Sequence, residues 1–361
     1  MKNKMTDDMT RNVKEIVAID LFCGIGGLTK GLSIAGINVI AGLDNDESCK
    51  FAYETNNDAV FLREDIKSVT AEELVQLYPA DSIKVLAGCA PCQPFSRYSS
   101  KYRKNGEKDE KWGLLYDFER LIMGVSPDVI SMENVPNLRN EKVFKDFVHT
   151  LMSNNYTVEY RVVNCIDYGV PQNRKRLVLL ASKHGKIKLI EPWCDKESYV
   201  SVRDAIGNLP PIDAGETCSN DLLHKSSSLS KKNLERIKQS IPGGTWRDWD
   251  EYLRVDCHRK ESGRTFPSVY GRMKWDEPSP TITTQFYGYG NGRFGHPEQN
   301  RAISLREGAI LQSFPTDYVF VDENHPAQKR ELGMHIGNAV PVLLGKAIGI
   351  SIMNHLNELK E

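Results

Sequence analysis

The chain has 361 residues, of which 40% are hydrophobic and 26% charged, so it is long enough for one large globular domain and a smaller one. No apolar run approaches the roughly 20 residues of a membrane helix, and residues 1–11 do not predict a secretory signal. The eight cysteines are scattered along the chain, which is typical of reduced thiols in a cytoplasmic protein. The formal net charge of -1 excludes a uniformly basic protein, so any nucleic-acid-binding surface must be a local patch of Lys and Arg.

Short apolar runs alternate with helix-like segments in the first half of the chain. Residues 16–19 predict a strand ending at Asp20, residues 28–35 a helix, and residues 37–43 a strand ending at Asp44. Further apolar runs occupy residues 85–87, 129–130 and 177–180. This alternation predicts an α/β fold with an open sheet covered on both faces, in which ligands bind beyond the carboxyl ends of the strands.

The sequence changes character near residue 183. From there to about residue 300 it is polar, rich in Gly and Pro and weakly periodic, which predicts a second, less regular domain. Residues 341–359 again have apolar residues at helical spacing, and we expect this helix to pack back on the first domain.

A glycine-rich turn follows the first predicted strand. Gly24, Gly26 and Gly27 precede the predicted helix, and glycine lets a backbone turn tightly and approach a ligand closely. In a dinucleotide-binding loop the third glycine lies three residues beyond the second, a position that Thr29 occupies here. The turn therefore fits a ligand that has adenosine but no pyrophosphate better, and the alternative is a turn without a ligand.

Acidic residues follow the next two strands. Asp44 ends the second strand, where its carboxylate could accept both hydroxyls of a ribose. Asp65 and Ile66 follow the third strand and could hold an adenine edge. These positions together predict a nucleoside-type pocket.

Cys89 and Cys92 form a C-x-x-C pair after the strand at residues 85–87. A zinc site would need a second ligand pair, and none has suitable spacing. A redox pair would need a helix beginning at Cys92, in which Pro94 is a poor interior residue. Besides these two alternatives and an inert thiol, Cys92 could be a nucleophile on a loop at the sheet edge, which is the interpretation we favour. The basic and aromatic residues 97–112 then predict a lid that follows a phosphate backbone, rather than a merely solvated loop.

Six segments with unusual residues occur in a fixed order. They are residues 20–28, 91–96, 133–135, 172–176, 301–315 and 337–341. This ordered set resembles the motifs of the C5-cytosine DNA methyltransferase family of the bacterial restriction-modification type, and the resemblance covers nearly the whole chain outside residues 183–300. It implies a doubly wound, Rossmann-like S-adenosylmethionine-dependent methyltransferase domain over residues 12–187 and 323–361. It also implies a smaller, irregular target-recognition domain and hinge over residues 188–322.

The resemblance implies a covalent mechanism on a flipped-out cytosine. Cys92 attacks ring carbon 6, and Glu133 protonates or hydrogen-bonds ring nitrogen 3, for which we expect a partly desolvated carboxyl. Arg174 and Arg176 bind the flipped nucleotide and its phosphates, with Arg176 nearest the base carbonyl. A capping or salt-bridge role for Glu133 and surface ion pairs for the arginines are the structural alternatives.

The same resemblance implies a set of contacts to the cofactor. Phe22 stacks on the adenine, Pro91 lines the pocket, Leu115 is a further contact, and Asn338 completes the pocket from the C-terminal segment. The whole expected cofactor-binding set is Asp20, Phe22, Gly24, Gly26, Gly27, Asp44, Asp65, Ile66, Pro91, Leu115 and Asn338. We expect no metal.

The expected substrate is double-stranded DNA, methylated at a specific sequence by a monomer in the bacterial cytoplasm, at the nucleoid. A cognate restriction endonuclease would be a functional partner without direct contact. A tRNA cytosine-5 methyltransferase on the same fold is the first alternative, which Ser96 and the long middle region disfavour. The second alternative is a non-catalytic DNA-binding regulator, although every motif side chain is present.

Overall fold

The computed structural model describes residues 14–91, 113–326 and 328–359. Its centre is a seven-stranded sheet of order β3-β2-β1-β4-β5-β7-β6, in which β1 to β5 run parallel and β7 runs antiparallel to both of its neighbours. The strands are β1 Ile16–Leu21, β2 Asn38–Asp44, β3 Val60–Arg63, β4 Ile83–Gly88, β5 Val129–Asn134, β6 Thr157–Asn164 and β7 Lys175–Ser182.

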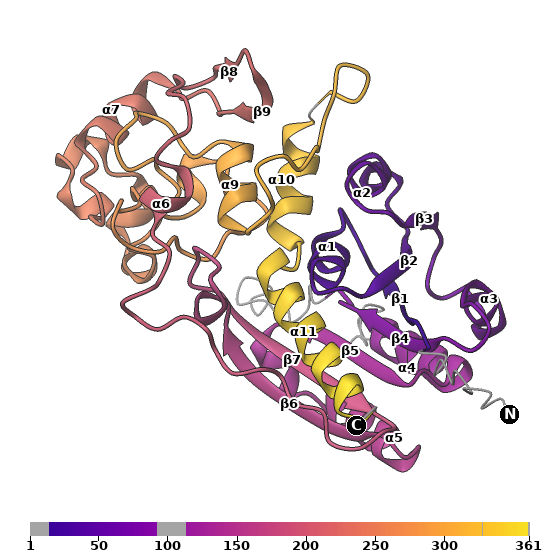
Figure 1. Cartoon of the computed structure of the whole chain (residues 1–361). Coiled ribbons are helices and arrows are strands. Elements are labelled where there is room, and N and C mark those ends of the chain that lie inside the picture. The colour runs from indigo at the N-terminus through magenta and orange to yellow at the C-terminus, as the bar shows by residue number, and fades with distance from the viewer. Residues whose placement is uncertain (1–13, 92–112, 327, 360–361) are drawn as a thin grey trace, which may run out of the picture.

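Helices cover both faces of the sheet, which confirms the predicted doubly wound α/β class (Figure 1). Alternate residues of β1 pack on opposite faces of the sheet, because successive side chains of a strand point in opposite directions. Val17 and Ile19 join the core with α3, α4 and α5, whereas Ala18 joins the core with α1 and α11. These helices and their neighbours are α1 Gly27–Ile34, α2 Lys50–Asn56, α3 Ala71–Leu77, α4 Gly113–Val125, α5 Lys142–Ser153, α10 Lys329–Asn338 and α11 Val342–Glu358.

The C-terminal helix packs back on the first helix, as the sequence predicted. Gly31 of α1 and Gly345 of α11 let the two backbones approach, since a Cβ on Gly31 would lie 2.4 Å from the carbonyl oxygen of Val342. Among the described residues, the stretch Lys329–Glu358 is long and apolar enough to cross a membrane, by length and composition only. Its most apolar window is 67% buried, because the apolar side chains pack inside the protein.

The polar middle of the chain forms an irregular lobe beside the sheet (Figure 1). Its regular elements are short: α6 Val202–Ile206, β8 Thr217–Cys218, β9 Asp221–Lys225, α7 Lys231–Gln239, α8 Asp256–Arg259 and α9 Leu305–Leu311. In the part of the chain that the structure describes, the 3-10 turns are η1 Glu47–Cys49, η5 Pro136–Asn140, η6 Cys165–Tyr168, η7 Trp246–Asp248, η8 Glu251–Leu253, η9 Glu261–Thr265 and η10 Tyr289–Asn291. Irregular backbone leaves carbonyl groups without ladder partners, and the buried Arg272 donates to those of Ile237, Ser240 and His296.

A buried ion pair lies within this lobe, at the start of α9. The guanidinium of Arg301 donates to both carboxylate oxygens of Glu307 at 2.7 Å, and both residues are at most 1% exposed. Glu307 also accepts the backbone N–H of Ser304 and so closes the N-terminus of α9. Although burial raises the pKa of Glu307, the hydrogen bonds and charge of Arg301 outweigh it and lower this pKa overall.

Glu307→Gln is expected to destabilise the protein by about 3–5 kcal/mol, because it leaves the Arg301 charge buried without a partner. Since the folded-state pKa of Glu307 is depressed, the contribution of the pair is present at neutral pH and lost as the pH falls through the folded pKa. Urea unfolding at pH 7 measures the loss. The control Asp276→Asn breaks an exposed ion pair with Arg203 and should change stability little, and equal effects of the two changes would contradict this account.

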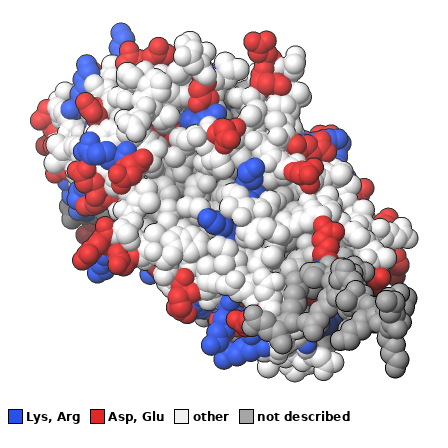
Figure 2. All heavy atoms as spheres, viewed as in Figure 1, with Lys and Arg blue, Asp and Glu red and all other residues white. Residues whose placement is uncertain are grey.

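Charged side chains on the face shown in Figure 2 lie mainly toward its margins, with Lys and Arg interspersed among Asp and Glu. The centre of this face is mostly white, with isolated Lys or Arg side chains in it. Over the described residues visible in this view, the mixture of signs agrees with the near-zero net charge.

Candidate active site

The loop after β1 forms the tight turn that its glycine pattern predicted. Phe22, Gly24 and Gly26 have φ angles of 61°, 50° and 83°, in the left-handed region that favours glycine. A Cβ on Gly26 would lie 2.5 Å from the amide nitrogen of Asn57, and one on Gly27 2.3 Å from the carbonyl oxygen of Val340. Nothing lies within 4 Å of a Cβ on Gly24. Gly26 and Gly27 are therefore required by packing within the chain, and only Gly24 borders open space.

One buried and one half-buried carboxylate, Asp20 and Asp44, flank this loop. Asp44 accepts the backbone N–H of Gly24 at 2.9 Å, and burial raises the pKa of its carboxyl. Asp20 accepts the hydroxyl of Thr29 at 2.7 Å through Oδ2, whereas its buried Oδ1 has no partner. Burial, and to a smaller extent the charge of Asp44, raises the pKa of Asp20 to about 7. The site thus holds a carboxylate oxygen that lacks a donor.

Asp20→Asn is expected to remove a pH dependence of stability. The folded pKa of about 7 exceeds the ordinary value of 3.8, so between these values the folded chain keeps a proton that the unfolded chain has lost. Stability should fall as the pH rises through this range, and at pH 8 the variant should be more stable by up to about 4 kcal/mol. Urea unfolding at pH 5 and pH 8, with the exposed Asp58→Asn as control, tests this. Parallel pH profiles of variant and parent would overturn it.

The remaining expected cofactor residues lie around the carboxyl edge of the sheet with differing exposure. Ile66 and Leu115 are buried in one hydrophobic cluster, and Phe22 packs against it. Asp65 and Pro91 are exposed. The exposed Asn338 ends α10.

A second cluster forms where β4, β5 and β7 lie side by side. Glu133, near the end of β5, is 3% exposed, so its carboxyl is desolvated as expected. The thiol of Cys89 donates to its Oε2 at 2.7 Å. The Nε atom of Arg176 lies 2.7 Å from Oε1 as an ion pair, but this contact is not aligned as a hydrogen bond, and the buried Oε1 has no hydrogen-bond donor.

Arg174 lies apart from this carboxylate, among backbone carbonyls. It is 3% exposed and donates to the carbonyl oxygens of Ile282 at 2.8 Å and Gly337 at 3.1 Å. Burial, followed by the charge of Arg176, lowers the pKa of its guanidinium to about 9. Arg174 therefore joins the segment that carries Arg176 to the end of α10 and to the lobe.

Cys92 and the predicted lid, residues 97–112, lie outside the described residues. Among the described residues, Cys89 belongs to no group of three possible metal ligands. Its contact with Glu133 was missed, because the sequence analysis considered Cys89 only as a partner for Cys92. The role of the buried Gln172 in joining distant segments was not predicted either. Its side chain accepts the N–H of Ile282 and donates to the carbonyl of Leu311. Membership of the segment 172–176 was the only signal for it.

The family assignment rests on the length of chain that matches. Residues 16–354 match the model of the C-5 cytosine-specific DNA methylases. The chain belongs to this family. This confirms the activity class that the ordered motifs predicted, methyl transfer to carbon 5 of cytosine in DNA.

Curated relatives of this methylase cover nearly its full length. The type II methylase M.HgiDII of Herpetosiphon aurantiacus is 52% identical over 346 residues, which are 95% of this chain and 96% of that protein. The type II methyltransferase M1.HphI of Haemophilus parahaemolyticus is 32% identical over 340 residues, 93% of this chain and 86% of that protein. The methylase is thus of the restriction-modification type.

Solved structures agree on the fold of the methylase. A prophage-encoded protein of E. coli superimposes with a TM-score of 0.72 at 23% identity, covering 95% of this chain and all of that one. The Dnmt2 methyltransferase of S. pombe superimposes with a TM-score of 0.59 at 17% identity, covering 96% of this chain and all of that one. The methylase therefore has the fold of this group of enzymes.

Proposed function

We propose that this methylase transfers a methyl group from S-adenosylmethionine to carbon 5 of a cytosine flipped out of a specific duplex sequence, through a covalent bond to Cys92. The observation that carries the proposal is the buried Oε1 of Glu133, which lacks a hydrogen-bond donor. The N3–H of a protonated cytosine, or its exocyclic amine, would supply that donor. The carboxylate lies one strand away from Cys89, which precedes Cys92 by three residues.

The glycine loop fits the proposed cofactor. S-adenosylmethionine carries positive charge on its ammonium and sulfonium groups, which the donor-less Oδ1 of Asp20 suits. Gly24, in the loop that follows, borders open space. Asp44 would bind the ribose, and Asp65 and Ile66 the adenine. The other proposed contacts are Phe22, Gly26, Gly27, Pro91, Leu115 and Asn338. When bound, the cofactor supplies an electrophilic methyl group.

Cys92 and Glu133 have separate roles in the proposed reaction. The sulfur of Cys92 forms a bond to ring carbon 6, and the electron pair of the 5,6 double bond makes carbon 5 nucleophilic. Glu133 holds a proton at ring nitrogen 3 while this charge develops. After methylation a base removes the proton from carbon 5, and Cys92 leaves as thiolate, which restores the double bond.

The two arginines have different proposed roles. Arg176 lies against Glu133, keeps that carboxylate oriented, and would bind the base carbonyl. Arg174 would act on the flipped nucleotide and its phosphates chiefly by holding the segments that surround them, because two of its donor nitrogens already bind the carbonyls of Ile282 and Gly337.

We propose that residues 12–187 and 323–361 form the catalytic domain and residues 188–322 the target-recognition domain and hinge, with duplex DNA between them. The irregular lobe, with its many loops, supports this division, since loops on a scaffold commonly carry recognition. By analogy with the type II methylases it resembles, the protein would act as a monomer in the cytoplasm, at the nucleoid. It would protect DNA from a cognate endonuclease without contacting that enzyme.

Methyl transfer from tritiated cofactor to duplex DNA and to tRNA tests the substrate. Label should enter DNA only, and bisulfite sequencing of the methylated DNA should then reveal one short target sequence. Label that enters only tRNA would replace the proposal by the RNA-modifying alternative. Sequence-specific DNA binding without any transfer would favour the non-catalytic regulator.

A further inference from the structure

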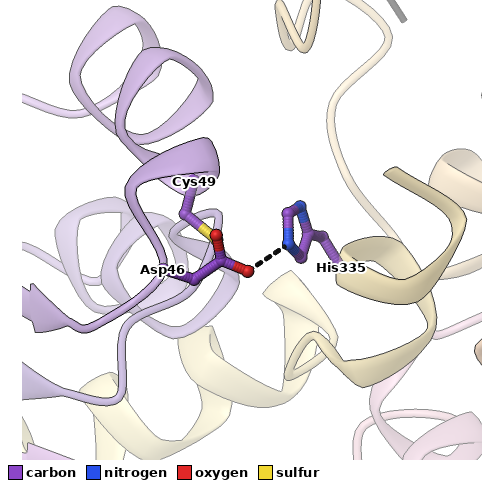
Figure 3. A group of neighbouring side chains, drawn as sticks. All are labelled: Asp46, Cys49 and His335. Carbon is purple, nitrogen blue, oxygen red and sulfur yellow. Dashed lines mark hydrogen bonds and ion pairs between the residues drawn. The ribbon is translucent and has the colours of Figure 1, made fainter. Parts of the chain in front are cut away.

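Three side chains with metal-binding atoms meet beside the cofactor loop, although the sequence predicted no metal. Asp46 and Cys49 come from the turn after β2, and His335 comes from α10 (Figure 3). One ligand atom from each lies within 4.8 Å of the other two. Cys49 is 2% and His335 7% exposed, whereas the side chain of Asp46 is 40% exposed, so the group is buried on one side and open to water on the other.

The turn holds the carboxylate in place. Oδ1 of Asp46 accepts the N–H of Ser48 at 3.1 Å and its hydroxyl at 2.5 Å, which leaves Oδ2 facing Nε2 of His335 at 3.0 Å. The other ring nitrogen of His335 is buried without a hydrogen-bond partner. Nε2, which faces Asp46, is the ring nitrogen available to the group.

The surroundings of Cys49 are electronegative. The carboxylates of Asp44, Asp46 and Glu331 lie near its sulfur. A bound cation would offset the repulsion among these carboxylates and draw the thiolate form, with release of a proton.

We propose that Asp46, Cys49 and His335 bind one divalent transition-metal ion of the zinc class, with water at the fourth position. One nitrogen, one sulfur and one oxygen ligand suit Zn²⁺ or Co²⁺ and not Mg²⁺ or Ca²⁺. Bond lengths of about 2.0–2.3 Å bring tetrahedral ligand atoms to about 3.5 Å from one another. From the observed separations, small side-chain rotations reach that spacing. The ion would tie the β2 turn, two residues beyond Asp44, to α10.

Cobalt titration of the full-length protein, stripped with chelator and kept reduced, tests the site. We expect one equivalent of Co²⁺ to bind with an intense thiolate-to-cobalt absorption, and Zn²⁺ to displace it. Cys49→Ser should lose the absorption, and His335→Gln should weaken binding by more than about tenfold. The metal should also raise the melting temperature of the parent and leave that of Cys49→Ser unchanged.

Two control variants separate this site from adventitious binding. Cys257→Ser and His325→Gln change an exposed cysteine and an exposed histidine elsewhere and should bind like the parent. Thermal melting without metal verifies that each variant is folded. Failure of the parent to bind one equivalent, or an unchanged cobalt spectrum in folded Cys49→Ser, would overturn the proposal whether or not the protein methylates DNA.

Discussion

Cys92→Ser is expected to abolish methyl transfer while leaving specific DNA binding intact. Serine is a far weaker nucleophile than a thiolate, so the loss should be on the order of 10⁴-fold or more. The measurement is transfer of tritiated methyl groups to duplex DNA, with a gel-shift assay for binding. Cys257→Ser changes an exposed cysteine and should keep full activity.

A mechanism-based trap tests the same sulfur through a covalent adduct that forms, and not through a loss of activity. Duplex DNA with 5-fluorocytosine at the target should form a stable adduct with the parent protein, because fluorine cannot leave as a proton. Peptide mapping should locate the adduct at Cys92. Substantial methylation by Cys92→Ser, or an adduct on another residue, would refute the covalent mechanism and leave the redox and zinc interpretations of the C-x-x-C pair open.

Glu133→Gln should lower kcat by about 10²–10⁴-fold with a much smaller effect on KM for DNA. Glutamine retains the shape and can still accept a hydrogen bond, but it cannot hold a proton for ring nitrogen 3. The rate of 5-fluorocytosine trapping should fall in parallel, because attack of the thiolate on carbon 6 is the step that Glu133 assists.

Glu191→Gln is the matched control, since Glu191 is 85% exposed and makes only a distant ion pair with Arg161. The melting temperatures of both variants show whether either change merely unfolds the protein, as Arg176 loses its partner in Glu133→Gln. A kcat within threefold of the parent in folded Glu133→Gln would remove this carboxyl from the chemistry.

Local sequence patterns were sufficient to predict the strands that are buried in the sheet. The apolar runs of β1, β2, β4 and the antiparallel β7 were predicted because strands covered on both faces are continuously hydrophobic. The edge strand β6 was not, since most of its residues are exposed or half-buried: Val158 and Val162 pack against one core, and Val163 is buried in the other. Ordered motifs then determined the family, because their residue types and order are rarely met together by chance.

Which side chains of those motifs touch was decided by tertiary structure alone. Cys89 and Glu133 are 44 residues apart and meet because β4 and β5 are neighbours in the sheet. Arg174 bears the charge of a ligand-binding residue, yet its two terminal nitrogens donate to backbone carbonyls more than 100 residues away. His335 and Asp46 are 289 residues apart, and packing of α10 beside the β2 turn brings them together. Sequence determines which elements form through local periodicity, whereas strand order and helix packing decide which distant polar groups share a site.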